Sequence, residues 1–291
     1  MQNKFVIVTG GSGKAGKWII AELLEHGYRV LNLDIKQPEK RLCDTLIVDL
    51  NDLGQVHNAL SQYGNFHQLR AEAIIHFAAI PCPFIYPNDI TFKNNVMSTY
   101  NIMEAAANLG IRKVVSASSE SSYGLCFAKD MFSPSYLPVD EEHPQLPEDS
   151  YGLSKVVNEQ TADAFYRRTG MQIISFRLGN ILEEQDYSAL KDVFEHQPEQ
   201  RIRNLWSYID VRDVASACRL AIETEGLGAQ HVILAANDTS SSMPSKQLIE
   251  RFFPDVADLR SSFENRTGLL SNSKAKQLLG WKQQHYWKEY V

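Results

Sequence analysis

A tyrosine and a lysine that could act together in acid–base chemistry stand four positions apart in the stretch YGLSK, which begins at Tyr151 and ends at Lys155. On an α-helix this spacing brings both side chains to one face, one turn apart. Asp149 or Ser150 could cap such a helix, and apolar positions continue its pattern towards Gly170. By itself the pair has two interpretations, a solvated surface pair or an acid–base device.

A glycine-rich stretch near the start of the chain could bind a phosphate group. The apolar run FVIVT leads into Gly10, Gly13 and Gly16, and a helical pattern follows. Glycines permit a tight turn and a close approach of the backbone, and a helix N-terminus offers free N–H groups to an anion. Asp34 ends the next apolar run, where a carboxylate can accept a hydrogen bond from an adenine ribose. Together these features predict a dinucleotide site, and Asp34 favours NAD because it would repel the 2′-phosphate of NADP.

To position these residues, the chain needs a parallel sheet covered on both faces. Apolar runs alternate with helical patterns, which predicts an α/β, Rossmann-like doubly wound parallel sheet. The expected strands are 4–9, 28–33, 45–48, 73–77, 112–117 and 171–177, and the expected helices are 16–26, 89–109 and 151–169. The Pro-rich, acidic run 131–150 is expected to be a loop.

Beyond Arg177 the alternation lapses into shorter, more polar elements, which indicates a smaller C-terminal substrate-binding lobe. The expected domains are an NAD-binding Rossmann domain at 1–177, to which 209–234 returns, and a substrate lobe made of 178–208 and 235–291.

Bulk properties narrow the function classes. The chain has 291 residues, of which 44% are hydrophobic and 22% charged, and a net charge of −6, which is typical of a soluble globular protein and argues against nucleic acid as the main partner. No apolar run reaches membrane-spanning length, and no leader pattern precedes Phe5. The four cysteines lie far apart and the eight histidines are scattered. We therefore expect a cytoplasmic protein with reduced thiols, no membrane partner and no metal site.

The motifs resemble those of the extended branch of the short-chain dehydrogenase/reductase superfamily, the NAD-dependent epimerase/dehydratase family. TGGSGKAG is similar to the family's TGxxGxxG, and SSESSYG at 118–124 resembles S-S-x-x-x-Y-G. YGLSK matches Y-x-x-x-K, and HFAA at 76–79 resembles the H-x-A-A loop beneath the cofactor. The motifs follow the family's order through nearly the whole chain.

The resemblance implies a catalytic role for three residues. Tyr151 would be the general acid/base, Lys155 its tuner, and Ser119 the partner that hydrogen-bonds the reacting oxygen. A free phenol has a pKa of about 10, so a nearby positive charge must stabilise the phenolate for it to act near neutrality.

The resemblance also implies NAD as the cofactor, although Lys14 and Lys36 could favour the 2′-phosphate of NADP. The residues expected to bind the cofactor are Gly10, Gly13, Lys14, Ala15, Gly16, Asp34, Asp49, Leu50, Phe77, Ala78, Ala79, Asn95, Tyr151 and Lys155.

A sugar-type substrate follows from the family, whose members include sugar-nucleotide epimerases, dehydratases and uronate dehydrogenases. Only 30 positions separate Asn180 from Asp210, where epimerases use a longer insertion to wrap the nucleotide diphosphate. The short lobe favours a small sugar or sugar acid. We expect one of three arginines, Arg201, Arg203 and Arg212, to face the pocket and bind a carboxylate. The predicted substrate contacts are Ser118, Ser119, Glu120, Asn180 and Arg203.

The predicted function is oxidation of a secondary or hemiacetal hydroxyl of a sugar or sugar acid by an NAD-dependent enzyme. A sugar-nucleotide 4-epimerase or dehydratase is the alternative within the enzyme class. A non-catalytic NAD-binding regulatory protein is the alternative outside it, and the joint presence of Ser119, Tyr151 and Lys155 disfavours that reading. The resemblance further implies a homodimer through the helices at 89–109 and 151–169.

Overall fold

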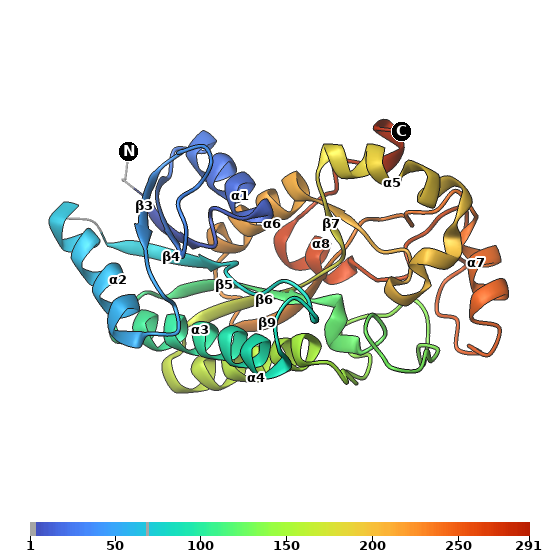
Figure 1. The fold of residues 1–291 in the computed structure, drawn as a ribbon, viewed down its shortest axis with the longest axis horizontal. Helices are drawn as coiled ribbons and strands as arrows, with labels where there is room; N and C mark the ends of the chain where they lie inside the picture. The colour runs from blue at the N-terminus through green and yellow to red at the C-terminus, as the bar shows by residue number, and fades with distance from the viewer. Residues whose placement is uncertain (1–3, 68–69) are drawn as a thin grey trace.

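The computed structural model describes residues 4–67 and 70–291, and the side chains of 62–67 are not among those described. Within this part of the chain, one seven-stranded sheet has the order β3-β2-β1-β4-β5-β6-β9, and every neighbouring pair is parallel (Figure 1). The strands are β1 (Phe5–Thr9), β2 (Arg29–Asp34), β3 (Asp44–Ile47), β4 (Ala71–His76), β5 (Lys113–Ser119), β6 (Gln172–Leu178) and β9 (Ala229–Leu234). The predicted Rossmann-like fold is confirmed. The strand order reverses between β1 and β4, and ligands of such sheets bind at the carboxyl ends of the strands near this point.

Helices cover both faces of the sheet (Figure 1). Those on one face are α1 (Lys14–Glu25), α6 (Val211–Glu223) and α8 (Ser273–Leu279), and those on the other are α2 (Leu53–His67), α3 (Asn88–Asn108) and α4 (Ser150–Thr169). Each layer buries its apolar stripe against the alternate side chains of the strands, so the strands are apolar on both faces. The core therefore has two halves, one on each side of the sheet.

The helix α2 was not predicted, because its sequence is polar and contains two glycines, Gly54 and Gly64. Tertiary packing compensates for this weak local signal, since Val56, Ala59 and Leu60 lie in the core. The predicted elements otherwise lie within a few residues of those observed.

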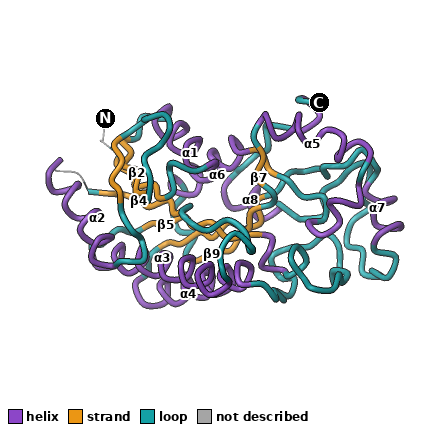
Figure 2. Tube along the Cα trace, in the orientation of Figure 1, coloured by secondary structure: helices purple, strands orange, loops and turns teal. Residues whose placement is uncertain are grey.

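A second, smaller part of the molecule lies beyond the carboxyl ends of the strands, and loops make up much of it (Figure 2). Its elements are β7 (Ile181–Leu182), α5 (Glu184–His196), the 3-10 helix η2 (Pro198–Asn204), β8 (Ile209–Asp210), α7 (Ser245–Phe252) and the 3-10 helix η3 (Trp287–Glu289). Within 209–234, β8 pairs with β7 in the smaller part, α6 packs on the large sheet, and β9 is the last strand of that sheet.

The segment 123–139, which lies within the range expected for the NAD-binding domain, shares the core of the smaller part. Tyr123, Leu137 and Val139 are buried against residues such as Trp206 and Phe253. Leu137 and Val139 also form isolated parallel bridges to Leu259 and Leu270. The Pro-rich run is thus a loop that packs against the smaller part of the molecule and is not a free connection.

Among the helices of the described residues, none has the length and apolarity needed to cross a membrane.

Candidate active site

The three predicted catalytic residues meet at the carboxyl end of β5. Ser119 is the last residue of this strand, and α4 carries Tyr151 and Lys155 on its first turns. The side chain of Asp149 caps α4 by accepting a hydrogen bond of 2.7 Å from the Gly152 N–H, as the sequence predicted. Tyr151 and Lys155 are buried, with 9% and 2% of their surface exposed. The Ser119 hydroxyl lies close enough to Tyr151 to lower the pKa of the phenol.

Lys155 is held in place at the base of the site. Its Nζ donates a hydrogen bond of 2.7 Å to the Ala117 carbonyl of β5 and lies 5.3 Å from the centroid of the Tyr151 ring. Burial lowers the pKa of Lys155 to about 8, and the negative charge of Glu159 acts in the opposite direction. The ammonium therefore stays mostly protonated at neutral pH, beside the phenol it was predicted to tune.

Burial has the largest effect on the pKa of the Tyr151 phenol. Burial raises the pKa of the phenol above its ordinary value, the Ser119 hydroxyl only partly offsets this, and the buried Glu120 adds to the increase. The sequence analysis assigned the stabilising positive charge to Lys155 together with the nicotinamide of the cofactor, and it did not consider desolvation, which favours the neutral phenol.

A buried ion pair connects β6 to α4, the helix that carries Tyr151 and Lys155. Arg177 of β6 donates two hydrogen bonds to Glu159 of α4, from Nε at 3.0 Å and Nη2 at 2.8 Å. The Ser118 hydroxyl donates to the same carboxylate at 2.6 Å. This bond directs Ser118, a predicted substrate contact, into the protein interior, so its place in the fold indicates a supporting role.

The glycine loop has the geometry expected of a phosphate cradle. Gly10 has a φ of +73°, and a Cβ there would lie 2.6 Å from the Ala78 backbone nitrogen. A Cβ at Gly16 would lie 2.1 Å from the Gly10 carbonyl oxygen, so the turn itself requires both glycines. Gly13 is different, because a Cβ there would meet only the Gly10 oxygen, at 3.2 Å. The space over Gly13 at the start of α1 is therefore left for a bound group, which fits the pyrophosphate of NAD.

Asp34 ends β2 beside this loop. Its Oδ2 accepts a hydrogen bond of 2.9 Å from the Ser12 N–H, and its Oδ1 accepts one of 2.8 Å from the Ile35 N–H. A carboxylate offers about four acceptor positions, so it can also accept from ribose hydroxyls. The residue thus stands where the sequence placed it, at the end of the strand next to the glycine turn.

We predict that NAD binds more tightly than NADP and that Asp34→Ala narrows or reverses this difference, since the carboxylate would repel a 2′-phosphate. Calorimetric titration of both cofactors checks this. Glu39→Ala, which removes an exposed acid in the following loop, should leave the ratio unchanged. Equal affinities of the wild type for the two cofactors would contradict the assignment.

The remaining predicted cofactor residues line the same edge of the sheet, but several of their side chains form hydrogen bonds to other parts of the protein. The Asn95 amide accepts from the Ile80 N–H at 2.8 Å and donates to the Ile80 carbonyl at 3.0 Å, which fixes the loop that contains Phe77, Ala78 and Ala79. This places Asn95 in support of the loop. Asp49 is exposed and accepts from the Asn51 N–H at 2.9 Å, whereas the next residue, Leu50, is buried.

Lys14 and Ala15 stand at the start of α1. The Lys14 ammonium forms an ion pair of 2.6 Å with Asp186 of α5, and Ala15 packs against the core. The predicted contact of Lys14 with phosphate would require this exposed ion pair to open.

On the substrate side, the structure brings together Glu120, Asn180 and Arg201. Glu120 begins the 3-10 helix η1 (Glu120–Tyr123) directly after Ser119 and is only 8% exposed. Burial raises the pKa of its carboxyl to about 8. Arg201 Nη1 donates to Asn180 Oδ1 at 3.2 Å, and the charges of Arg201 and Glu120 shift each other's pKa values towards the ionised forms.

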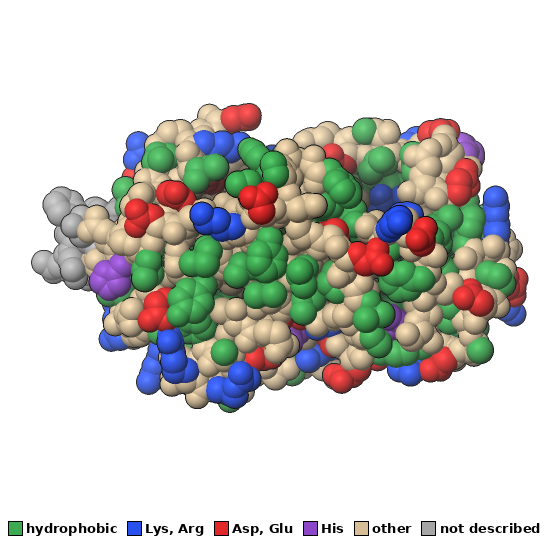
Figure 3. Space-filling model, turned by 60° about the horizontal axis from the view of Figure 1, so that its bottom comes forward, with side chains coloured by type: hydrophobic (Ala, Val, Ile, Leu, Met, Phe, Trp, Pro, Cys, Tyr) green, Lys and Arg blue, Asp and Glu red, His purple; other side chains and the backbone are tan. Residues whose placement is uncertain are grey.

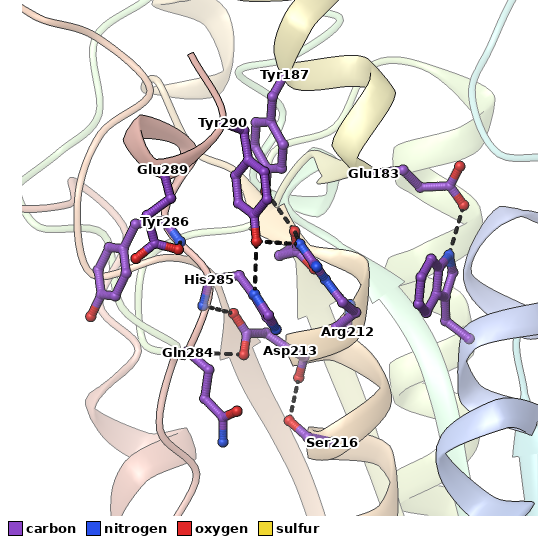
Figure 4. A network of polar contacts seen from close by, with 12 residues as sticks. Glu183, Tyr187, Arg212, Asp213, Ser216, Gln284, His285, Tyr286, Glu289 and Tyr290 are labelled. Carbon is purple, nitrogen blue, oxygen red and sulfur yellow. Dashed lines mark hydrogen bonds and ion pairs between the residues drawn. The ribbon is translucent and has the colours of Figure 1, made fainter. Parts of the chain in front are cut away.

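The other two candidate arginines lie elsewhere. Arg203 is exposed and donates to the Ala128 carbonyl at 2.6 Å. Arg212 is paired with both oxygens of Asp210 at 2.8 Å and donates to the Tyr290 hydroxyl at 2.7 Å, within a network that anchors the C-terminal segment (Figure 4). Of the three arginines, Arg201 is therefore the one beside Glu120, whereas the sequence analysis selected Arg203.

Sequence reasoning also missed Phe127, whose ring contacts the Tyr151 ring edge-to-face at 6.4 Å between centroids. It belongs to no motif, and nothing in its sequence context marks it. The sequence also could not single out Arg201. Its position beside Glu120 depends on an interruption of η2 at this residue, where φ is −120° and not helical. In the described part of the chain, no three His, Cys, Asp or Glu side chains gather where they could hold a metal ion.

Residues 6–235 match the family described as the NAD dependent epimerase/dehydratase family. The chain is 34% identical over 194 residues to a Methanocaldococcus jannaschii protein named "Putative UDP-glucose 4-epimerase", an alignment that covers 62% of this chain and 57% of that protein. It is 27% identical over 223 residues to the L-arabinose 1-dehydrogenase (NAD(P)(+)) of Haloferax volcanii. This alignment covers 75% of this chain and 82% of that protein. A short-chain dehydrogenase/reductase superfamily protein from Agrobacterium tumefaciens, solved with bound NAD, has the same fold, with a TM-score of 0.72 and 18% sequence identity. The superposition covers 98% of this chain and 94% of that chain.

Proposed function

Because the chain belongs to the NAD-dependent epimerase/dehydratase family, of the extended short-chain dehydrogenase/reductase type, and uses NAD, we propose that it is a dehydrogenase that oxidises a sugar hydroxyl and releases NADH. The observation that carries this proposal is the shared burial of Ser119, Tyr151 and Lys155 at the carboxyl end of the sheet, next to the glycine loop. A regulatory protein that only binds the cofactor would have no need of this trio.

Each of the three side chains has a defined task in this proposal. Ser119 Oγ accepts a hydrogen bond of 3.1 Å from the Ser121 N–H, which holds its hydroxyl at the strand end for the reacting oxygen. The Tyr151 phenolate, which the Lys155 ammonium stabilises, takes the proton of the substrate hydroxyl and becomes the neutral phenol. When bound, oxidised NAD would supply the hydride acceptor and a further positive charge near the Tyr151 phenol. Burial excludes water from the transfer.

The short segment after Asn180 supports a dehydrogenase over an epimerase. The helices α5 and η2 occupy most of this segment, and side-chain contacts connect the start of α5 to α1. Glu183 accepts from Trp18 Nε1 at 2.9 Å and pairs with Lys17 at 2.7 Å, so the first turn of α5 lies against the cofactor-binding helix (Figure 4). We propose that the lobe of 178–208 and 235–291 holds a small substrate, because no insertion is present to wrap a nucleotide diphosphate.

A panel of aldoses and sugar acids with NAD, followed by NADH absorbance, tests the proposal. Formation of NADH together with an oxidised sugar supports it. Interconversion of sugar nucleotides without net NADH would favour the alternative, a 4-epimerase. Binding of NAD with no turnover of either substrate class would favour a regulatory protein.

We also propose a homodimer through α3 and α4, and a cytoplasmic location stays a prediction of the sequence. Hydrophobic side chains gather on the face of the molecule that Figure 3 shows. Met97 and Tyr100 of α3 and Leu153 and Tyr166 of α4 each leave about two fifths of their surface exposed, between 39% and 44%. A second copy of the chain could cover them.

For this dimer we predict that Met97→Glu yields a monomer, because it would bury a charge in the interface. Light scattering of the purified protein measures the mass. Leu24→Glu, at a residue of α1 that is 37% exposed, is the control and should stay dimeric. A wild type with the mass of one chain would contradict the proposal.

A further inference from the structure

The loop between β4 and α3 exposes three consecutive large apolar side chains. Phe84, Ile85 and Tyr86 leave 80%, 53% and 53% of their surface exposed, and they stand between Pro83 and Pro87. Because prolines restrict the backbone, the loop holds these side chains in solvent with little freedom to fold them away. Apolar groups that gather on the surface in this way mark a contact site for another molecule.

Two ring contacts connect this loop to the catalytic phenol. Phe84 has a φ of +71°, a conformation that a residue with a Cβ adopts only where its surroundings fix it. Its ring packs edge-to-face against the Phe127 ring, with 6.3 Å between the centroids. Phe127 in turn packs edge-to-face against the Tyr151 ring at 6.4 Å. A change in the position of the exposed loop therefore reaches Tyr151 through one intervening side chain.

The loop continues the apolar face of α3 and α4 that is proposed above as the dimer interface. Ile90, in the first turn of α3, is 44% exposed and lies on the same side of the helix as Met97, about two turns further along. The Ser150 hydroxyl at the start of α4 donates a hydrogen bond of 3.0 Å to Asn88 Oδ1. The end of the loop thus lies beside the first turn of α4, where Leu153 is 44% exposed.

The charge of this surface favours a second copy of the chain as the partner. Between residues 80 and 103 the sequence holds one acid, Asp89, and one base, Lys93, whereas the whole chain has a net charge of −6. A two-fold interface places a surface against its own copy, so a surface of one charge sign would repel itself. An apolar surface without net charge has no such repulsion, and it offers no complementary charge to an acidic or basic partner.

We propose that the loop 84–90 docks against a second copy of the chain as an extension of the α3–α4 interface, and that this contact positions Tyr151 through the rings of Phe84 and Phe127. The inference rests on the proposed homodimer and adds that each active site is complete only when the partner is bound. Phe84 and Phe127 are positioning residues in this arrangement, and Tyr151 remains the catalytic one.

Two variants that disrupt the interface at separate points test the coupling. Ile85→Glu in the loop and Met97→Glu on α3 should each raise the dissociation constant of the dimer by at least about thirtyfold, as for a central interface residue. Each monomer should keep the wild-type affinity for NAD and lose about ten- to a hundredfold in kcat, because a displaced catalytic group costs this much. Light scattering measures the mass, calorimetry the NAD affinity, and NADH absorbance the turnover of a sugar found in the panel. Leu24→Glu on α1 is the control and should behave as the wild type.

Phe84→Leu separates the ring contact from the interface. Leucine keeps an apolar side chain in the loop but removes the ring that packs against Phe127. The variant should stay dimeric and bind NAD as the wild type does, and it should still lose at least about tenfold in kcat. A residue with only a structural role would lower the melting temperature and leave kcat unchanged.

Hydrogen exchange gives a readout that needs no substrate. In the wild-type dimer we expect slow exchange of the backbone N–H groups of 84–90 and 125–128, the segments that carry Phe84 and Phe127. In the Met97→Glu monomer both segments should exchange at least about tenfold faster, because the partner no longer covers the loop. Exchange in the central strand β6 should be the same in both proteins.

The inference would be overturned by monomers with wild-type kcat, by a Phe84→Leu variant with wild-type kcat, or by exchange at 125–128 that does not respond to Met97→Glu. A dimeric Ile85→Glu beside a monomeric Met97→Glu would keep the α3–α4 dimer and reject the contact of the loop. A wild type with the mass of one chain would reject both. Failure of the proposed dehydrogenase appears differently, since no form would then turn over a sugar, and the mass and the hydrogen exchange would still decide the inference.

Discussion

Replacing Tyr151 by Phe is expected to lower turnover by about 10²–10⁴-fold and to leave the affinity for NAD nearly unchanged. The variant removes one oxygen, the proton acceptor, from a ring that is 9% exposed and packed edge-to-face against Phe127. The ring and its packing stay, so the loss should appear in kcat. The measurement is steady-state kinetics with NAD and an aldose identified from the panel, together with calorimetry of NAD binding.

Tyr166→Phe is the matched control, since it removes a hydroxyl from the same helix at a residue that is 41% exposed. It should retain wild-type turnover. If Tyr151→Phe also turned over at nearly the wild-type rate, the assignment of the general base would be wrong.

Replacing Glu159 by Gln is expected to lower the free energy of unfolding by about 3–5 kcal/mol, because it leaves the buried Arg177 without its counter-charge. The pair is 2.8 Å apart with side-chain exposures of 5% and 1%, so solvent does not screen it. The same carboxylate accepts from Ser118 at 2.6 Å and from Gln145 at 3.0 Å, and these bonds would be disturbed as well. Urea denaturation at neutral pH measures the loss.

The control for this variant is Glu104→Gln, which breaks the ion pair of 2.6 Å with Arg168 on the surface of α3 and α4. Side-chain exposures of 20% and 51% predict a loss of no more than about 1 kcal/mol. The Arg177 pairing lowers the pKa of Glu159, so its contribution is present above the ordinary value of about 4.3 and is lost as the pH falls through the folded value. Equal losses of unfolding free energy in the two variants would contradict this account. A difference between these losses that does not become smaller at acid pH would also contradict it.

The cofactor half of the site was predictable because its signals are local. Gly10 and Gly16 are dictated by the turn they form, and Asp149 caps the helix that begins one residue later. The parallel order of the strands then brings Ser119 and Tyr151 to the same edge without further information.

The substrate half was not predictable, because its geometry depends on contacts between distant segments. Arg201 and Arg203 look alike in the sequence, and only the break of η2 and the partners from residues 180, 207 and 240 turn the first of them towards Glu120. Desolvation likewise appears only in the folded chain, which is why the pKa values of Tyr151 and Glu120 differ from those their sequence neighbours suggest. The packing of 123–139 into the smaller lobe has the same origin.

The most direct test of the central claim is hydride transfer from a sugar to a cofactor that leaves the enzyme. Aldoses deuterated at every carbon are incubated with the protein and NAD, and the released NADH is analysed by mass spectrometry. The account predicts NADH carrying one deuterium for each oxidised sugar, and almost none with Tyr151→Phe. A deuterated sugar recovered with inverted configuration and no released NADH would contradict it.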